Sequence, residues 1–340
     1  MRLSLLEYLA CPSCGGDFDV HVIRKNEPAG MEEIQEGALE CRSCKMLYPI
    51  KNYIPRFVPE QTNELQAATI RNFGFEWQTW NAFGWGDSVP METTRAIFDY
   101  KVLKKRGELE GKLVLDGGCG NGRYTAVASE YGGTVIGIDL STAVDVAFEN
   151  LKHDSKVHIV QGDLFHPPFK KERFDFIFSN GVLMHTGNAK RAFQSLCRFL
   201  KPAGEITIHL YHKGNFIYEA VDASLRWIIL KLPLKTALAI SKVMAKITSW
   251  IPKGNASTVV NGFIRLEPHP HYVFDWYTAP IATHHTYPEV YRWLEEEKLF
   301  LVHDHNATAQ GWKRKVIPFL FMTVKASKLP SAGLPLHTRE

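Results

Sequence analysis

Short apolar runs alternate with stretches of helical spacing through the middle of the chain. Five runs lie at residues 113–115, 134–140, 157–160, 174–178 and 205–211, and two more lie at residues 300–305 and 318–324. Such runs are typical of buried strands, and their alternation with helices favours a parallel sheet covered by helices on both faces. The pattern therefore predicts an α/β protein with a doubly wound sheet.

A glycine-rich turn follows the first run. Asp116 stands at the end of that run, Gly118, Gly120 and Gly122 follow at every second position, and a helical pattern begins at Arg123. Glycines in such a turn let the backbone approach a ligand where any Cβ would clash. The order D-x-G-x-G-x-G differs from the G-x-G-x-x-G of dinucleotide-binding turns, and the acid suits a ligand with a cationic amino group.

Polar residues stand at the ends of the next three runs. They are Asp139, Asp163 and Ser179. Ligands of parallel sheets bind beyond the carboxyl ends of the strands, so we expect these side chains and the glycine turn to line one site. Asp139 lies about 20 residues past the turn, where an acid is placed to accept hydrogen bonds from a ribose diol.

The segments LVLDGGCGNG, VIGIDLS, QGDLF and FDFIFSNGVLMH resemble the successive motifs of class I S-adenosylmethionine-dependent methyltransferases. The resemblance covers residues 110–212 closely and implies a seven-stranded, Rossmann-like sheet whose last strand is antiparallel. In the family, these motifs bind the methionine end, the ribose and the adenine of S-adenosyl-L-methionine and line the methyl-transfer site. The cofactor-binding residues so implied are Asp116, Gly118, Gly120, Gly122, Asp139, Asp163, Leu164, Ser179 and Asn180. The last segment is also similar to small-molecule methyltransferases, including quinone-biosynthesis enzymes.

Two C-x-x-C pairs stand near the start of the chain. Cys11 and Cys14 are separated from Cys41 and Cys44 by 26 residues. Four thiolates in two such pairs are typical of a closed tetrahedral Zn²⁺ site, which has no position for water and is therefore expected to be structural. A disulfide would need an oxidising compartment, and residues 1–10 lack the apolar stretch of a secretion signal, so we expect a cytoplasmic protein.

The cysteine segment resembles the zinc ribbons fused to many bacterial methyltransferases and the small activator subunit of some RNA and protein methyltransferases. Ribosomal RNA methyltransferases that act on a guanine ring nitrogen carry a ribbon in the same place. Their last zinc ligand is a histidine, where this chain has Cys44. This difference weakens the likeness to RNA methyltransferases and leaves RNA open as an acceptor.

A basic segment lies between the fifth run and the C-terminal runs. The chain has a net charge of +4, and residues 223–266 hold seven Lys or Arg residues and no Asp or Glu. Apolar residues recur there at three- and four-residue steps, with Lys235, Lys242 and Lys246 opposite, which predicts an amphipathic helix. The apolar positions are Leu234, Ala237, Ile240, Met244, Ile247 and Ile251, and Pro233 and Pro252 bracket them.

Three roles stay open for this helix. It is a cap packed on the sheet domain, a lid over an apolar substrate, or a peripheral contact with an anionic membrane through residues 223–253. Nucleic-acid binding is less favoured, because no aromatic side chains stand between the lysines to stack on bases. No apolar run reaches the ~18 residues that a membrane span needs.

Three histidines are candidates for a catalytic base. His185 directly follows the fourth-strand motif, and His284 and His285 precede a predicted capping box formed by Thr286 and Glu289. Methyl transfer to oxygen or carbon usually needs a base, and a neutral imidazole with a pKa near ~6.5 suits that role. The same C-terminal segment also holds Asp275, Trp276 and Tyr277.

A predicted helix over residues 72–80 either closes over the cofactor or packs on the domain.

Together these patterns divide the chain into six segments. They are a zinc-ribbon domain at 1–58, a linker with cofactor-capping helices at 59–110, the cofactor-binding core at 111–212, the basic helical insertion at 213–270, the C-terminal part of the sheet at 271–328 and a tail at 329–340. The expected function is methyl transfer from S-adenosyl-L-methionine to oxygen or carbon of a small-molecule or lipid- or glycan-linked acceptor. The alternatives are a ribosomal or transfer RNA base methyltransferase and a non-catalytic interaction module that keeps the fold.

Overall fold

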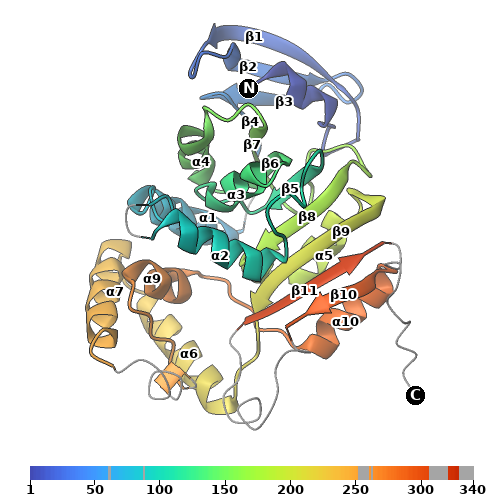
Figure 1. The fold of residues 1–340 in the computed structure, drawn as a ribbon. Coiled ribbons are helices and arrows are strands. Elements are labelled where there is room, and N and C mark those ends of the chain that lie inside the picture. The colour runs from blue at the N-terminus through green and yellow to red at the C-terminus, as the bar shows by residue number, and fades with distance from the viewer. Residues whose placement is uncertain (60–62, 87–88, 252–259, 262, 306–320, 329–340) are drawn as a thin grey trace.

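A computed structural model describes residues 1–59, 63–86, 89–251, 260–261, 263–305 and 321–328. Its centre is one sheet of eleven strands in the order β1-β2-β3-β4-β7-β6-β5-β8-β9-β11-β10 (Figure 1). The strands are β1 (Phe18–Asn26), β2 (Glu33–Cys41), β3 (Leu47–Lys51), β4 (Ile54–Phe57), β5 (Leu113–Gly117), β6 (Thr134–Asp139), β7 (Val157–Gly162), β8 (Phe174–Asn180), β9 (Leu200–Tyr211), β10 (Phe300–Asp304) and β11 (Phe321–Ser327).

The expectation of a seven-stranded sheet was wrong, because the N-terminal ribbon joins the same sheet. Its strand β4 pairs in parallel with the edge strand β7, so that Arg56 faces Gln161 and Phe57 faces Gly162. An edge strand leaves backbone groups unpaired, and β4 satisfies them here. The guanidinium of Arg56 reinforces the junction by donating to Gln161 Oε1 at 2.8 Å and to Asp145 Oδ1 at 2.6 Å.

Helices cover both faces of the sheet. They are α1 (Glu64–Thr79), α2 (Met91–Val102), α3 (Arg123–Glu130), α4 (Ala143–Leu151), α5 (Ala189–Cys197), α6 (Phe216–Ile229), α7 (Leu234–Thr248), α9 (Pro270–Thr278) and α10 (Tyr287–Glu296), with short 3₁₀ turns η1 (Leu3–Glu7) and η2 (Leu183–His185). Successive residues of β5 show the two faces: Val114 packs with α2, α3 and α4, whereas Leu115 packs in the core on the side of α5 and α10. This arrangement is typical of parallel sheets, whose strands are buried on both sides.

The C-terminal strands complete the sheet with a reversed edge. β11 is antiparallel to both of its neighbours, β9 and β10. The predicted capping box is present at the start of α10, where the Thr286 amide donates to Glu289. The start of the predicted strand at residues 318–324 and the predicted tail at 329–340 lie outside the described residues.

The segment 201–204 belongs to β9, whose pairing with β8 shifts register between Phe174 and Phe176. Further along the chain, α9 has Pro270 in its first turn, and the ring of its N-cap residue His269 accepts from the His271 amide. Residues 279–285, between α9 and the capping box, are not helical.

The inserted helices pack beside the sheet rather than on it. α7 lies against α9 (Figure 1), and its most buried positions are Ala237, Ser241 and Ala245. These small residues let the two helices approach closely, so the predicted apolar stripe is displaced and Ile247 is about half exposed. No helix in the described part of the chain is both long and apolar enough to cross a membrane.

Candidate cofactor and acceptor site

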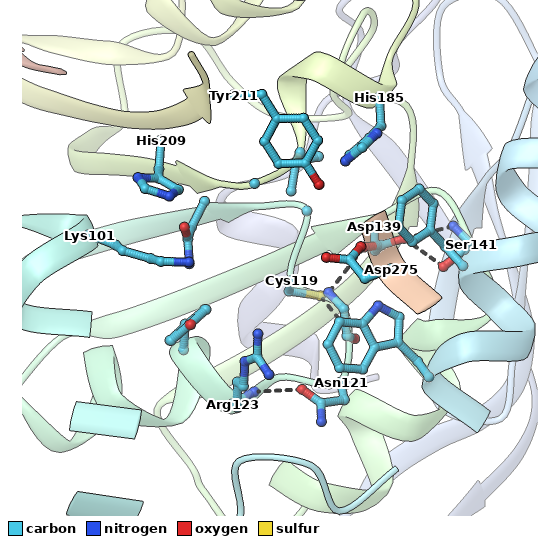
Figure 2. A pocket seen from close by; sticks show the side chains of 18 of the residues that line it. Lys101, Cys119, Asn121, Arg123, Asp139, Ser141, His185, His209, Tyr211 and Asp275 are labelled. Atoms are coloured by element: carbon cyan, nitrogen blue, oxygen red, sulfur yellow. Dashed lines mark hydrogen bonds between the residues drawn. The ribbon is translucent and has the colours of Figure 1, made fainter. Parts of the chain in front are cut away.

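A cavity of about 600 Å³ lies at the carboxyl ends of the strands (Figure 2). Its floor is made by the ends of β5, β6, β7, β8 and β9, and its other walls come from α1, α2, α9 and the start of β11. This volume falls within the ~300–1,000 Å³ that is usual for small-ligand sites. The cavity therefore has room for a ligand of cofactor size at the edge that the sequence indicated.

The glycine turn after β5 forms part of the floor. The amides of Gly118 and Cys119 donate to the Ile138 carbonyl at 2.7 and 3.0 Å, which ties the turn to β6. Gly118 has a φ of 95°, and a Cβ there would overlap the Val182 side chain. A Cβ on Gly120 would lie 2.9 Å from the Trp77 ring. Both positions therefore require glycine for backbone conformation and for space.

Asp139 is held rigidly beside this turn. Its Oδ2 accepts from the Gly120 amide at 3.0 Å, and its Oδ1 accepts from the Ser141 amide and hydroxyl at 2.9 and 2.8 Å. Burial raises the pKa of Asp139 above its usual range. Each carboxylate oxygen has two lone pairs, so the oxygen that receives a single amide can also accept from a ribose hydroxyl.

Asp163 and Leu164 line the next part of the cavity, past the end of β7. Asp163 Oδ1 accepts from the Phe165 amide at 2.9 Å, and Asp163 Oδ2 lies 3.7 Å from His166 Nδ1. Leu140 and Phe165 line the same region and supply apolar surface. A hydrogen-bond acceptor beside apolar walls suits an adenine ring, which is the group that the resemblance implies at Asp163 and Leu164.

Three predicted cofactor residues lie behind the cavity wall. Asp116 is 2% exposed and its Oδ2 accepts from Thr125 Oγ1 at 2.7 Å. Burial raises the pKa of Asp116 to about 7. Ser179 donates to the Gly117 carbonyl at 2.7 Å, and Gly122 begins α3 with a φ of 83°. These three residues pack behind the glycine turn and do not line the cavity, whereas Asn180 lines it.

His185 lines the cavity from η2, beyond the end of β8. Its Nδ1 donates to the Ile281 carbonyl at 2.6 Å, so its Nε2 carries the lone pair. Nε2 is buried and has no hydrogen-bond partner among the described residues. The ring lies between Phe73 and Tyr211, at centroid distances of 5.1 and 5.3 Å (Figure 2). Burial lowers the pKa of His185 to about 3.

The structure does not bring His284 and His285 to the cavity wall. His284 Nδ1 lies 2.7 Å from Glu219 Oε2, and His285 Nδ1 lies 2.9 Å from Glu289 Oε1. The His285 amide also donates to the Tyr211 carbonyl at 2.9 Å, which fastens this segment to the end of β9. The two side chains therefore belong to the framework around the site.

The cavity also holds charged side chains to which the sequence assigns no role, and two of them, Asp275 and Lys101, have no ion-pair partner among the described residues. Asp275 on α9 was noted only as one reactive group among several, and Lys101 on α2 was not noted at all. Within the described part of the chain, neither forms a hydrogen bond or an ion pair. Burial raises the pKa of Asp275 to about 6 and lowers the pKa of Lys101. Figure 2 shows both among the groups that face the cavity.

The four N-terminal cysteines meet at one point. The Sγ atoms of Cys11, Cys14, Cys41 and Cys44 all lie within 4.8 Å of one another. Four sulfurs at ~2.3 Å from a tetrahedral Zn²⁺ would be about 3.8 Å apart, so the cluster fits this ion. Both turns have the same form, because the Gly15 amide donates to the Cys11 carbonyl and the Lys45 amide to the Cys41 carbonyl.

Comparisons with known proteins agree with this geometry. Residues 115–208 match the family model described as methyltransferase domain, and residues 2–52 match the model described as Trm112p-like protein. The strand-end cavity and its glycine turn agree with this match, and the class is therefore that of a methyltransferase domain carried by residues 115–208. More particularly, the chain joins this domain to an N-terminal Trm112-like domain whose four cysteines are consistent with zinc.

The curated relatives differ in what their names say they methylate. The chain is 34% identical over 119 residues to phosphoethanolamine N-methyltransferase 2 of Caenorhabditis elegans, which covers 34% of this chain and 27% of that protein. It is 34% identical over 126 residues to demethylmenaquinone methyltransferase of Lactococcus lactis, with 35% and 50% covered. It is 30% identical over 137 residues to tRNA U34 carboxymethyltransferase of Campylobacter curvus, with 38% and 46% covered. Each match spans half or less of the relative, so the acceptor class is unresolved.

Proposed function

We propose that this chain transfers the methyl group of S-adenosyl-L-methionine to a small-molecule or lipid- or glycan-linked acceptor. The observation that carries the proposal is the single cavity of about 600 Å³. It extends from Asp163 and Asp139 to Tyr211 and Phe321, beneath helices that cover it. Cofactor and acceptor would therefore meet in one cavity, which aligns the reacting atoms.

The order of the strands supports an orientation for the cofactor. Adenine would lie at Asp163 after β7, the ribose at Asp139 after β6, and the methionine end at the turn after β5. The methyl group would then point toward Asn180 and His185, beyond β8. Arg123 lines the same end, forms no ion pair among the described residues and would bind the cofactor's carboxylate.

Two side chains are candidates for removing the acceptor's proton. His185 presents a free Nε2, but a pKa of about 3 makes it a weak base. Asp275 has a pKa of about 6, so it is mostly ionised at neutral pH and is a stronger base than an ordinary carboxylate. A base serves transfer to oxygen or carbon, so we propose Asp275 as the principal acceptor of the proton and His185 as a positioning group.

Calorimetry with S-adenosyl-L-methionine and S-adenosylhomocysteine tests the function. We expect both to bind the unsubstituted protein, and Asp139→Asn to weaken both by removing the charge that faces the ribose. A protein that binds neither would favour the alternative of a non-catalytic module with the same fold.

An RNA acceptor is the second candidate, and the Trm112-like domain and the transfer RNA relative favour it. The position of the cavity beneath α1, α2 and α9 favours the small acceptor, because a base would have to leave its strand to enter it. Binding to bulk RNA that falls steeply with added salt would support the RNA alternative. Binding that is absent at every salt concentration would support the small acceptor.

A peripheral membrane contact through residues 223–253 stays a prediction. α7 carries Lys235, Lys242 and Lys246, and the aromatic side chains Phe216 and Trp227 of α6 and Trp250 after α7 are 87%, 64% and 74% exposed. Lys231 Nζ lies 3.2 Å from the centre of the Trp227 ring. Aromatic groups beside lysines suit the boundary between lipid headgroups and acyl chains.

A further inference from the structure

The cavity is longer than the cofactor that we propose for it. Asp139 ends β6 and Phe321 begins β11, and four intervals separate these strands in the order β6-β5-β8-β9-β11. At about 4.8 Å per interval, the two positions are roughly 19 Å apart. About seven bonds of about 1.5 Å separate the cofactor's ribose ring from its carboxylate oxygens, so that chain reaches less than about 10 Å. The hydrogen bond to Asp139 and the ribose ring add about 5 Å, so the cofactor would end short of β11.

Two cationic side chains converge at this far end. Lys101 Nζ lies 5.3 Å from the centre of the Phe321 ring, and Arg265 Cζ lies 4.9 Å from the same centre. His209 stacks on Phe321 at 5.1 Å. Figure 2 shows Lys101 and His209 on the opposite side of the cavity from Asp139. The two cations come from different parts of the chain and share one aromatic contact.

The positive charge at this end is only partly compensated. Arg265 pairs with Glu267, but its Nε is buried without a hydrogen-bond partner among the described residues. Lys101 has no anionic partner there within ion-pair distance, and the nearby charges of Arg123 and Arg265 add to burial in lowering its pKa. The facing acid, Asp275, attracts Lys101 and is not within 4.0 Å of it. Lys101 is partly buried; an ammonium that is removed from water without an anionic partner is costly, and a bound anion would reduce that cost.

We propose that the methyl acceptor carries one anionic group, a carboxylate or a phosphate, which binds Lys101 and Arg265 at the β11 end of the cavity. The inference rests on the proposed function and names the class of its acceptor. The apolar or aromatic body of the acceptor lies against Phe321 and Tyr211. Its nucleophilic atom then faces His185 and Asp275, between the anion site and the cofactor's methyl group.

The test uses the full chain saturated with S-adenosylhomocysteine and three matched probes. They are 4-hydroxybenzoate, phenyl phosphate and the neutral 4-hydroxybenzamide, followed by a wider panel of small acids paired with their amides. Calorimetry should show that at least one acid binds tenfold or more tightly than its neutral partner. The preference between carboxylates and phosphates in the panel identifies which anion the site takes.

Substitutions at Lys101 assign the preference to this site. Lys101→Met should weaken the acid at least tenfold and leave the amide and S-adenosylhomocysteine unchanged, whereas Lys101→Arg should restore most of the affinity. Lys105→Met is the matched control, because Lys105 is exposed three residues past the end of the same helix. It should behave like the unsubstituted protein.

Two results would overturn the inference. One is a panel in which no acid binds more tightly than its amide. The other is a Lys101→Met protein that loses S-adenosylhomocysteine as strongly as it loses the acid, which would assign Lys101 to the cofactor. If the unsubstituted protein did not bind S-adenosylhomocysteine at all, the proposed function itself would fail, and this is visible before any acceptor probe is added.

Discussion

Replacing Asp275 by Asn should stabilise the protein while it impairs methyl transfer. Burial raises the pKa of Asp275 from an ordinary value of 3.8 to about 6, a shift of about two units, which corresponds to about 3 kcal/mol. Because the folded state holds this proton more tightly than the unfolded chain does, the native protein loses stability as pH rises from about 4 to about 6. Asn imitates the protonated acid and removes that loss.

Urea unfolding between pH 4 and pH 8 measures this effect. The two proteins should be equally stable near pH 4, and Asp275→Asn should become more stable by up to about 3 kcal/mol above pH 6. Glu267→Gln is the matched control, because Glu267 lines the same cavity but is paired with Arg265. Glu267→Gln should not increase the stability of the protein above pH 6. A stability difference that does not change with pH would refute the reasoning about burial.

Turnover provides the second measurement once an acceptor has been found. If Asp275 takes the acceptor's proton, the substitution should lower the rate by ~10²–10⁴. The rate of the unsubstituted protein should rise with pH and level off above about 6, where the carboxylate is ionised. If Asp275→Asn turned over within a few-fold of the rate of the unsubstituted protein, another side chain would be the base, or the methyl group would be transferred to nitrogen.

Two further predictions concern the glycine turn and the basic surface. Gly118→Ala should lower affinity for S-adenosylhomocysteine at least tenfold, because its Cβ overlaps Val182; Gly107→Ala, which has a similar φ and open space around it, should leave that affinity unchanged in the same calorimetric titration. The double change Lys242→Glu and Lys246→Glu should weaken binding to phosphatidylserine vesicles by at least ~2 kcal/mol, since each lysine near such a surface contributes about 1 kcal/mol. Sedimentation that finds no vesicle binding by the unsubstituted protein would contradict the predicted membrane contact.

The sequence predicted the elements whose signals are local. The apolar runs marked the central strands to within a few residues, and Asp139 and Asp163 could be placed because the carboxyl ends of parallel strands meet at one edge. The cysteine spacing likewise indicated the cluster at the N-terminus. In each instance the informative residues are neighbours in sequence or follow from a regular sheet geometry.

The remaining features depend on contacts that no local pattern encodes. The pairing of β4 with β7 joins residues about a hundred positions apart, and either strand alone is compatible with an open edge. His284 and His285 were candidates because they are adjacent to a helix start, but Glu219 and Glu289 engage them outside the cavity. Lys101 is notable because it has no ion-pair partner among the described residues, and whether a charge is paired is a tertiary property.

The ribbon is connected to the cofactor site by two routes. Arg56 on β4 binds Gln161, whose Nε2 donates to the carbonyls of Leu140 and Ser141 at 3.0 and 3.3 Å, and both of these residues line the cavity. In the second route, the ribbon backbone meets the segment that follows Asp163 and Leu164. The Ala10 amide donates to the Pro168 carbonyl, and the Lys170 amide donates to the Tyr8 carbonyl.

Removal of zinc should therefore weaken cofactor binding as well as unfold the ribbon. Structural zinc supplies much of the folding free energy of such small domains, so a chelator should release the segment that holds β4 against β7. We expect the affinity for S-adenosylhomocysteine to fall several-fold in calorimetry and to recover when Zn²⁺ is restored. Arg56→Leu leaves all four cysteines in place and interrupts the first route, so it should produce part of the same loss. A ribbon that unfolds while the affinity stays unchanged would show that the shared sheet joins two independent units.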